Sequence, residues 1–106
     1  EQLEEKIKNN TAEIIDVREQ SEYDAIHIKN SKLIPLNELQ SRLGEIDWSK
    51  DVVFICRSGA RSQSAANFAS STSQNVFNLK GGIYQLYKEG KNDLLEISPS
   101  GVEDYF

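Results

Sequence analysis

Residues 51–62 have the sequence Asp-Val-Val-Phe-Ile-Cys-Arg-Ser-Gly-Ala-Arg-Ser, in which an apolar run leads directly into a small polar loop. The run from Asp51 to Cys56 is nearly continuous and follows a charged turn, a pattern typical of a strand covered on both faces. We therefore expect this segment to be the central strand of a parallel sheet, with the polar loop at its carboxyl end.

Strand-like and helix-like segments alternate on both sides of this run. Short apolar or alternating runs predict further strands at 13–17, 32–35 and 75–79. Helical spacing and capping residues predict helices at 1–9, 21–28, 36–43, 61–70 and 83–88. The alternation predicts an α/β fold whose central, mostly parallel sheet has about five short strands and carries helices on both faces. Ligands of such sheets bind beyond the carboxyl ends of the strands, where the polar clusters 16–18 and 56–62 lie.

The composition is that of one small acidic domain. A chain of 106 residues supports one compact core, so we expect a single domain over residues 1–106. The net charge of −5 and the lack of a basic stripe argue against nucleic acid as a partner, and no apolar run is long enough to cross a membrane. One cysteine and one histidine argue against a metal site, and a free thiol suggests the cytoplasm. Because the chain contains no methionine, even at position 1, we expect it to be a piece of a longer gene product.

The loop after the central strand suits a reactive cysteine. A thiolate is favoured where backbone N–H groups, a helix N-terminus and arginines converge, and Cys56 is followed by all three. Gly59 allows a positive φ, so that successive N–H groups can turn inward around the sulfur. A lone cysteine at the end of a core strand is more often an inert buried residue. The two arginines, two serines and one glycine that follow Cys56 favour the functional interpretation.

Residues 56–61, Cys-Arg-Ser-Gly-Ala-Arg, resemble the active-site loop of the rhodanese family, the thiosulfate sulfurtransferases. Other segments resemble the family in the same order along the chain: 14–18 with Glu22-Tyr23 and His27-Ile28, then Ile34-Pro35, then 76–83 with Gly81-Gly82. The match covers about residues 13–90 and leaves 91–106 as a C-terminal extension. The acidic tail from Asp93 to Phe106 is then either an ordered extension or a tether.

The resemblance implies a rhodanese-like fold and a two-step transfer of sulfane sulfur. Cys56 would take the outer sulfur of thiosulfate or a persulfide donor and pass it to cyanide, a small thiol or a protein thiol. The loop residues Arg57, Ser58, Gly59, Ala60, Arg61 and Ser62 would hold the persulfide and bind the donor, with the two guanidinium groups attracting its oxyanion. No metal or organic cofactor is required.

Three further sets of polar residues each allow a structural and a functional interpretation. Asp16 could accept N–H groups from the loop and Arg18 could pair with Glu22, which would support the site from behind, although a solvated ion pair is the plainer interpretation. His27 is better explained as a hydrogen-bonded structural residue than as a general base. Tyr84 and Tyr87, which belong to the last helix, are expected to be packing residues, and one of them could line the rim of the pocket.

Two other functions remain open from the sequence. Phosphatases of the cell-division-cycle type and related arsenate reductases have a similar fold but use a Cys-x5-Arg loop, whereas four residues separate Cys56 from Arg61 here. A rhodanese-like domain can also be a non-catalytic binding or regulatory module. Such modules usually lack the cysteine that this chain retains.

Overall fold

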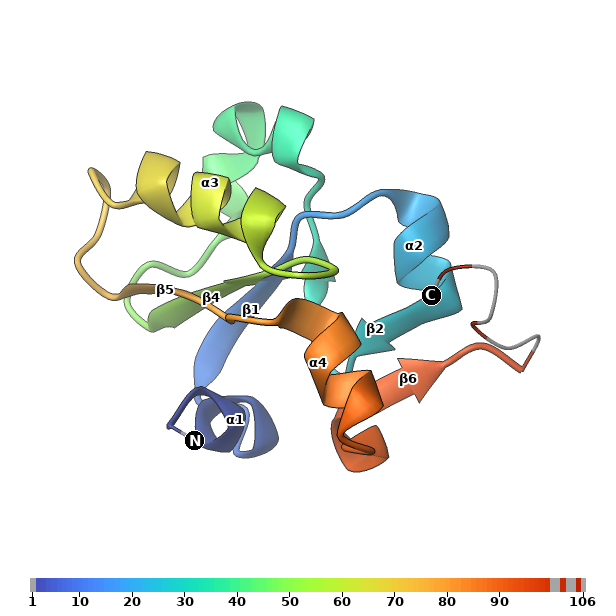
Figure 1. Ribbon diagram of the computed structural model, residues 1–106. Coiled ribbons are helices and arrows are strands. Elements are labelled where there is room, and N and C mark those ends of the chain that lie inside the picture. Colours follow the sequence, from blue (N-terminus) through green and yellow to red (C-terminus); the bar gives the residue numbers. More distant parts are fainter. Residues whose placement is uncertain (1, 100–101, 103–104, 106) are drawn as a thin grey trace.

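The computed structural model describes residues 2–99, 102 and 105, and its main sheet contains four parallel strands in the order β3-β1-β4-β5. These strands are β1 (Ala12–Asp16), β3 (Lys32–Leu33), β4 (Asp51–Ile55) and β5 (Val76–Asn78). The α-helices are α1 (Gln2–Lys8), α2 (Gln20–Ala25), α3 (Ala60–Ala69) and α4 (Gly82–Lys88). The predicted α/β fold, with its parallel sheet and helices on both faces, is confirmed (Figure 1).

The apolar run singled out in the sequence is the inner strand β4, which pairs with β1 on one side and β5 on the other. Val53 and Ile55 belong to a core on one face, which α1 and α4 cover. Val52 and Phe54 belong to a second core on the opposite face, beneath α3 (Figure 1). Because both faces are covered, the strand is apolar and buried from Val52 to Ile55, after the half-buried Asp51 at its start.

Two segments differ from the sequence-based expectation. The helix expected over residues 21–28 ends at Ala25, and residues Ile26–Ile28 form β2, which pairs antiparallel with β6 (Leu95–Ile97) in a separate two-stranded sheet. Because β6 lies almost seventy residues after β2 in the sequence, no local pattern predicts their pairing. The helix expected over residues 36–43 is instead a pair of short 3-10 helices, Leu36–Glu38 and Gln40–Glu45, in which Arg42 departs from helical φ and ψ.

The described part of the C-terminal tail is packed against the domain. A third 3-10 helix, Asn92–Leu94, leads into β6, and Ser98 donates its backbone N–H to the carbonyl of Ala25 at 2.8 Å. Val102 is only 4% exposed within the core that α4 covers. Of the two alternatives for the tail, these residues form an ordered extension; residues 100–101, 103–104 and 106 lie outside the described part, as does Glu1 of the helix predicted at 1–9.

Candidate active site

The polar loop lies where β4 ends and α3 begins, at the carboxyl edge of the sheet. Gly59 caps α3 with a φ of +107°, a left-handed conformation that side chains rarely adopt. This turn brings the loop backbone around the sulfur of Cys56, which is 1% exposed. Of the predicted site residues, the structure buries Cys56, Gly59, Ser62, Asp16 and Arg18, partly exposes Arg57 and Arg61, and leaves Ser58 and Ala60 exposed.

Several hydrogen-bond donors surround Cys56 Sγ. The N–H of Gly59 lies at 3.0 Å, the N–H of Ser62 at 3.4 Å and the Ser62 hydroxyl at 3.3 Å. Burial by itself would raise the pKa of Cys56. The hydrogen bonds from Ser62, Gly59 and the backbone of Ser58 outweigh it and hold that pKa below the value of an ordinary thiol. The loop is therefore arranged to hold negative charge on sulfur.

The double glycine Gly81-Gly82, at the start of α4, packs against the backbone of the loop. Ile83 donates its N–H to the carbonyl of Cys56 at 3.0 Å, and Tyr84 donates to the carbonyl of Arg57 at 2.9 Å. Gly82 has a φ of +59°, and a Cβ built on it would lie 2.4 Å from the Cys56 carbonyl oxygen and 2.5 Å from that of Arg57. Only glycine allows the two backbones to approach this closely.

Arg61 reaches from α3 to α2, where its two terminal nitrogens donate to the carboxylate of Glu22 at 2.8 and 2.9 Å. The bidentate bond lowers the pKa of Glu22 to about 2, while Glu22 and the nearby Cys56 raise the pKa of Arg61. The expected pairing of Arg18 with Glu22 is wrong, because Glu22 faces the loop arginine. Part of the positive charge expected to attract an anion is thus neutralised by a carboxylate.

Asp16 and Arg18 form a fully buried ion pair beside the loop. The Arg18 guanidinium donates to both Asp16 oxygens at 2.7 to 3.1 Å, to the carbonyl of Ile26 at 2.5 Å and to the hydroxyl of Tyr105 at 3.0 Å. The Arg18 N–H also donates to Asp16. Asp16 was expected to accept N–H groups from the loop. The hydrogen bonds of its side chain in the described residues go to Arg18 instead, so the pair joins β1 to β2 and to the C-terminal segment.

Arg57 lies against two aromatic rings at the mouth of the loop. Its guanidinium carbon is 5.2 Å from the ring centroid of Tyr84 and 5.7 Å from that of Tyr105, distances typical of cation–π contacts. Tyr84 is therefore the aromatic residue of the last helix that meets the rim. Tyr105 lies at the far end of the chain, and nothing in the local sequence pattern pointed to it.

Asn78 was also missed by the sequence analysis. It is the last residue of β5, and its side-chain oxygen accepts a hydrogen bond from the Ser62 hydroxyl. Its side-chain nitrogen donates to the carbonyl of Gly59 at 3.2 Å and to Gln63 Oε1 at 3.1 Å. A polar residue at the carboxyl end of the strand next to β4 was the available signal, because this edge of a parallel sheet holds its ligands.

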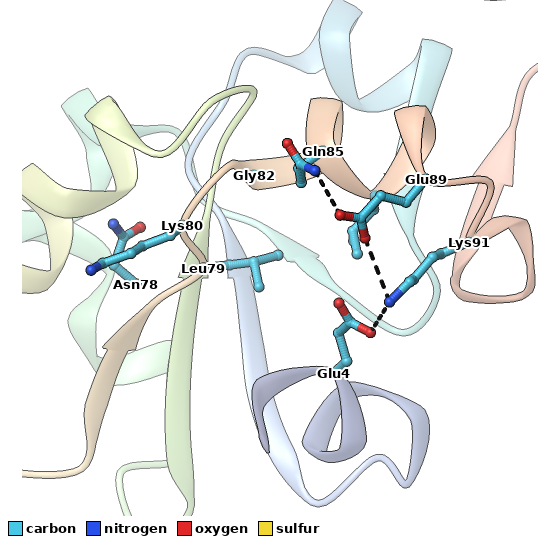
Figure 2. A pocket seen from close by; sticks show the side chains of 9 residues that line it. Glu4, Asn78, Leu79, Lys80, Gly82, Gln85, Glu89 and Lys91 are labelled. Atoms are coloured by element: carbon cyan, nitrogen blue, oxygen red, sulfur yellow. Dashed lines mark hydrogen bonds and ion pairs between the residues drawn. The ribbon is translucent and has the colours of Figure 1, made fainter. Parts of the chain in front are cut away.

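Other candidate features lie away from the sulfur. His27 stacks on Tyr23 with ring centroids 3.9 Å apart, and its Nδ1 is 2.8 Å from the Tyr23 carbonyl oxygen, which fits the structural role expected of it. A cavity of about 480 Å³ lies between α1 and α4, and Glu4 and Glu89 meet Lys91 there (Figure 2). No residue of the loop 56–62 lines this cavity. Within the described residues, no helix is long and apolar enough to span a membrane, and no cluster of His, Cys, Asp and Glu could hold a metal ion.

Comparisons with known proteins find relatives similar in sequence and in fold. A family model, the rhodanese-like domain, matches residues 1–89. A protein of Allochromatium vinosum named sulfurtransferase is 34% identical over 89 residues, 83% of this chain and 80% of that protein. The uncharacterized protein YqhL of Bacillus subtilis is 39% identical over 73 residues, 68% of this chain but 58% of YqhL. The crystal structure of a rhodanese-related protein from Thermoplasma volcanium has a TM-score of 0.76 and 35% identity, covering 83% of this chain and 86% of that one.

Proposed function

We propose that this chain, which belongs to the rhodanese-like domain family, is a sulfurtransferase that moves sulfane sulfur through a persulfide on Cys56. The donor is thiosulfate or a persulfide, and the acceptor is cyanide, a small thiol or a protein thiol. The observation that carries the proposal is the ring of N–H and O–H groups around Cys56 Sγ. A thiolate held in this way is the nucleophile that sulfur transfer needs.

In the first step the Cys56 thiolate attacks the outer sulfur of thiosulfate. A bond forms between Sγ and that sulfur, the S–S bond of thiosulfate breaks, and its electron pair leaves with sulfite. Arg57 and Arg61, at the mouth of the loop, would orient the sulfonate oxygens of the donor, although Arg61 must share its charge with Glu22. The reaction needs no metal and no organic cofactor.

In the second step an acceptor attacks the terminal sulfur of the persulfide. Cyanide forms a carbon–sulfur bond and leaves as thiocyanate, whereas a thiolate leaves as a new persulfide. In both cases the electron pair of the Sγ–S bond returns to Cys56 and restores the thiolate. The loop N–H groups would stabilise the anionic sulfur before and after each step. A reducing compartment such as the cytoplasm suits this cycle, because it keeps the thiol free.

Mass spectrometry of the intact protein tests the proposal. After incubation with thiosulfate, the protein should gain the mass of one sulfur atom, and cyanide should remove it with release of thiocyanate. Cys56→Ser is nearly isosteric and should fold, yet neither gain the mass nor turn over. If the native protein gains no sulfur from thiosulfate, polysulfide or a persulfide donor, the carrier function is refuted and a non-catalytic binding role takes its place.

Hydrolysis of an aryl phosphate separates this function from that of the related phosphatases. The loop places its N–H groups within 3.0 to 3.4 Å of a single sulfur atom, and a ring one residue larger would be needed to enclose a tetrahedral oxyanion. We expect negligible hydrolysis. Hydrolysis that disappears in Cys56→Ser would favour the phosphatase instead.

A further inference from the structure

The hydroxyl of Ser62 stands between two acceptors but has one proton to donate. Cys56 Sγ lies 3.3 Å from Ser62 Oγ, and on its other side this oxygen is hydrogen-bonded to Asn78 Oδ1. Ser62 is fully buried, so bulk water does not reach its hydroxyl, whereas Asn78 is partly exposed. The proton can point to the sulfur or to the amide oxygen, and the two bonds exclude each other.

The amide of Asn78 is held in one orientation. Its nitrogen donates to the backbone carbonyl of Gly59 at 3.2 Å and to Gln63 Oε1 at 3.1 Å. If the amide turned over, its oxygen would face the Gly59 carbonyl, which can only accept. The Asn78 oxygen therefore faces Ser62, and an oxygen without a proton of its own attracts the hydroxyl proton.

We propose that Asn78 is a positioning residue that draws the Ser62 proton away from Cys56 and so restrains formation of the thiolate. In the neutral state Ser62 donates to Asn78, and the thiol can donate its own proton to Ser62 Oγ. When the thiol proton leaves to solvent, the Ser62 hydroxyl must turn from Asn78 to the sulfur. Ionisation of Cys56 is thereby coupled to loss of the Ser62–Asn78 hydrogen bond.

If Cys56 carries sulfur as proposed above, Asn78 also affects the persulfide state. Formation of the persulfide moves the negative charge from Sγ to the terminal sulfur, so Sγ no longer needs the Ser62 proton. The bond to Asn78 can then form again. Asn78 would thus favour the sulfur-loaded cysteine over the empty thiolate.

The pH profile of Cys56 alkylation by iodoacetamide, followed by intact mass, tests the proposal without any sulfur donor. Asn78→Ala should move the midpoint to lower pH and raise the rate below the midpoint by roughly fivefold to tenfold, the effect of no longer breaking one neutral hydrogen bond, that between Ser62 and Asn78. Ser62→Ala should move the midpoint to higher pH. Asn78→Leu should act as Asn78→Ala does. Because leucine resembles asparagine in shape, this variant controls for the packing that alanine removes.

The double variant decides between this role and a structural one. In a Ser62→Ala background, Asn78→Ala should leave the midpoint unchanged, since no proton remains to be redirected. Gln63→Ala, which removes another partner of the same amide, is the matched control and should keep the native midpoint. The charged side chains around the loop, which are Arg57, Arg61 with Glu22, and the Asp16–Arg18 pair, are the same in every variant.

Two outcomes would overturn the proposal. One is an unchanged or higher midpoint in Asn78→Ala. The other is a shift of equal size with and without Ser62, which would mean that Asn78 acts by holding the Gly59 carbonyl. Because alkylation requires only a reactive thiol, either outcome leaves the sulfurtransferase function to be judged separately by its persulfide assay.

Discussion

Gly82→Ala should destabilise the protein by far more than an ordinary surface substitution. The added Cβ would lie 2.4 Å from the Cys56 carbonyl oxygen and 2.5 Å from that of Arg57, so the two backbones must separate. A φ of +59° costs alanine about 1–2 kcal/mol. Separation also weakens the hydrogen bonds to these two carbonyls from Ile83 and Tyr84, each worth about 1 kcal/mol. We expect a total loss of about 3–4 kcal/mol.

Gly90→Ala is the matched control for the backbone conformation. Gly90 has a φ of +74° but no atom within 4 Å of an added Cβ, so this variant should lose only the conformational cost of about 1–2 kcal/mol. Gly44→Ala, which is also unobstructed, should change stability by less than about 0.5 kcal/mol. Urea denaturation of the three variants measures these differences, and thiocyanate formation at a temperature where all are folded measures the effect on the loop. Equal losses for Gly82→Ala and Gly90→Ala would refute the close approach of the double glycine to the loop.

Three further predictions concern the charged residues around the loop. Glu22→Gln should free the charge of Arg61 and lower the KM for thiosulfate, whereas Arg61→Ala should raise this KM more than it lowers kcat. Steady-state kinetics at low and high salt measure both effects. A KM that is unchanged in Arg61→Ala and at high salt would mean that Arg61 does not contact the donor. The pKa of Glu22 is lowered to about 2 from 4.5, so the stability that this carboxylate contributes is complete above pH 4.5 and is lost as the pH falls toward 2. Denaturation across that range should show a smaller loss in Glu22→Gln. Arg18→Met should cost roughly 3–5 kcal/mol, because it leaves the buried Asp16 carboxylate without a partner, and Asp16→Leu combined with Arg18→Met should recover much of the loss in the same denaturation assay.

The local sequence was enough to predict the central strand and the turn that follows it. A continuous apolar run predicts a strand covered on both faces, and β4 has this environment. Gly59 after Cys56 predicts a tight turn of N–H groups, and the Gly59 N–H lies 3.0 Å from Sγ. These features can be predicted from the sequence because strand burial and loop conformation depend on neighbouring residues of the chain.

The partners of the charged and polar side chains were decided by tertiary structure. Arg18 pairs with Asp16 and Tyr105 rather than with Glu22, which binds Arg61 instead. Asn78 meets Ser62 only because β5 lies next to β4, and β2 forms only because β6 returns beside it. Hydrogen bonds and ion pairs act over a few ångströms, so the choice among several possible partners depends on which distant segments the fold brings within that range.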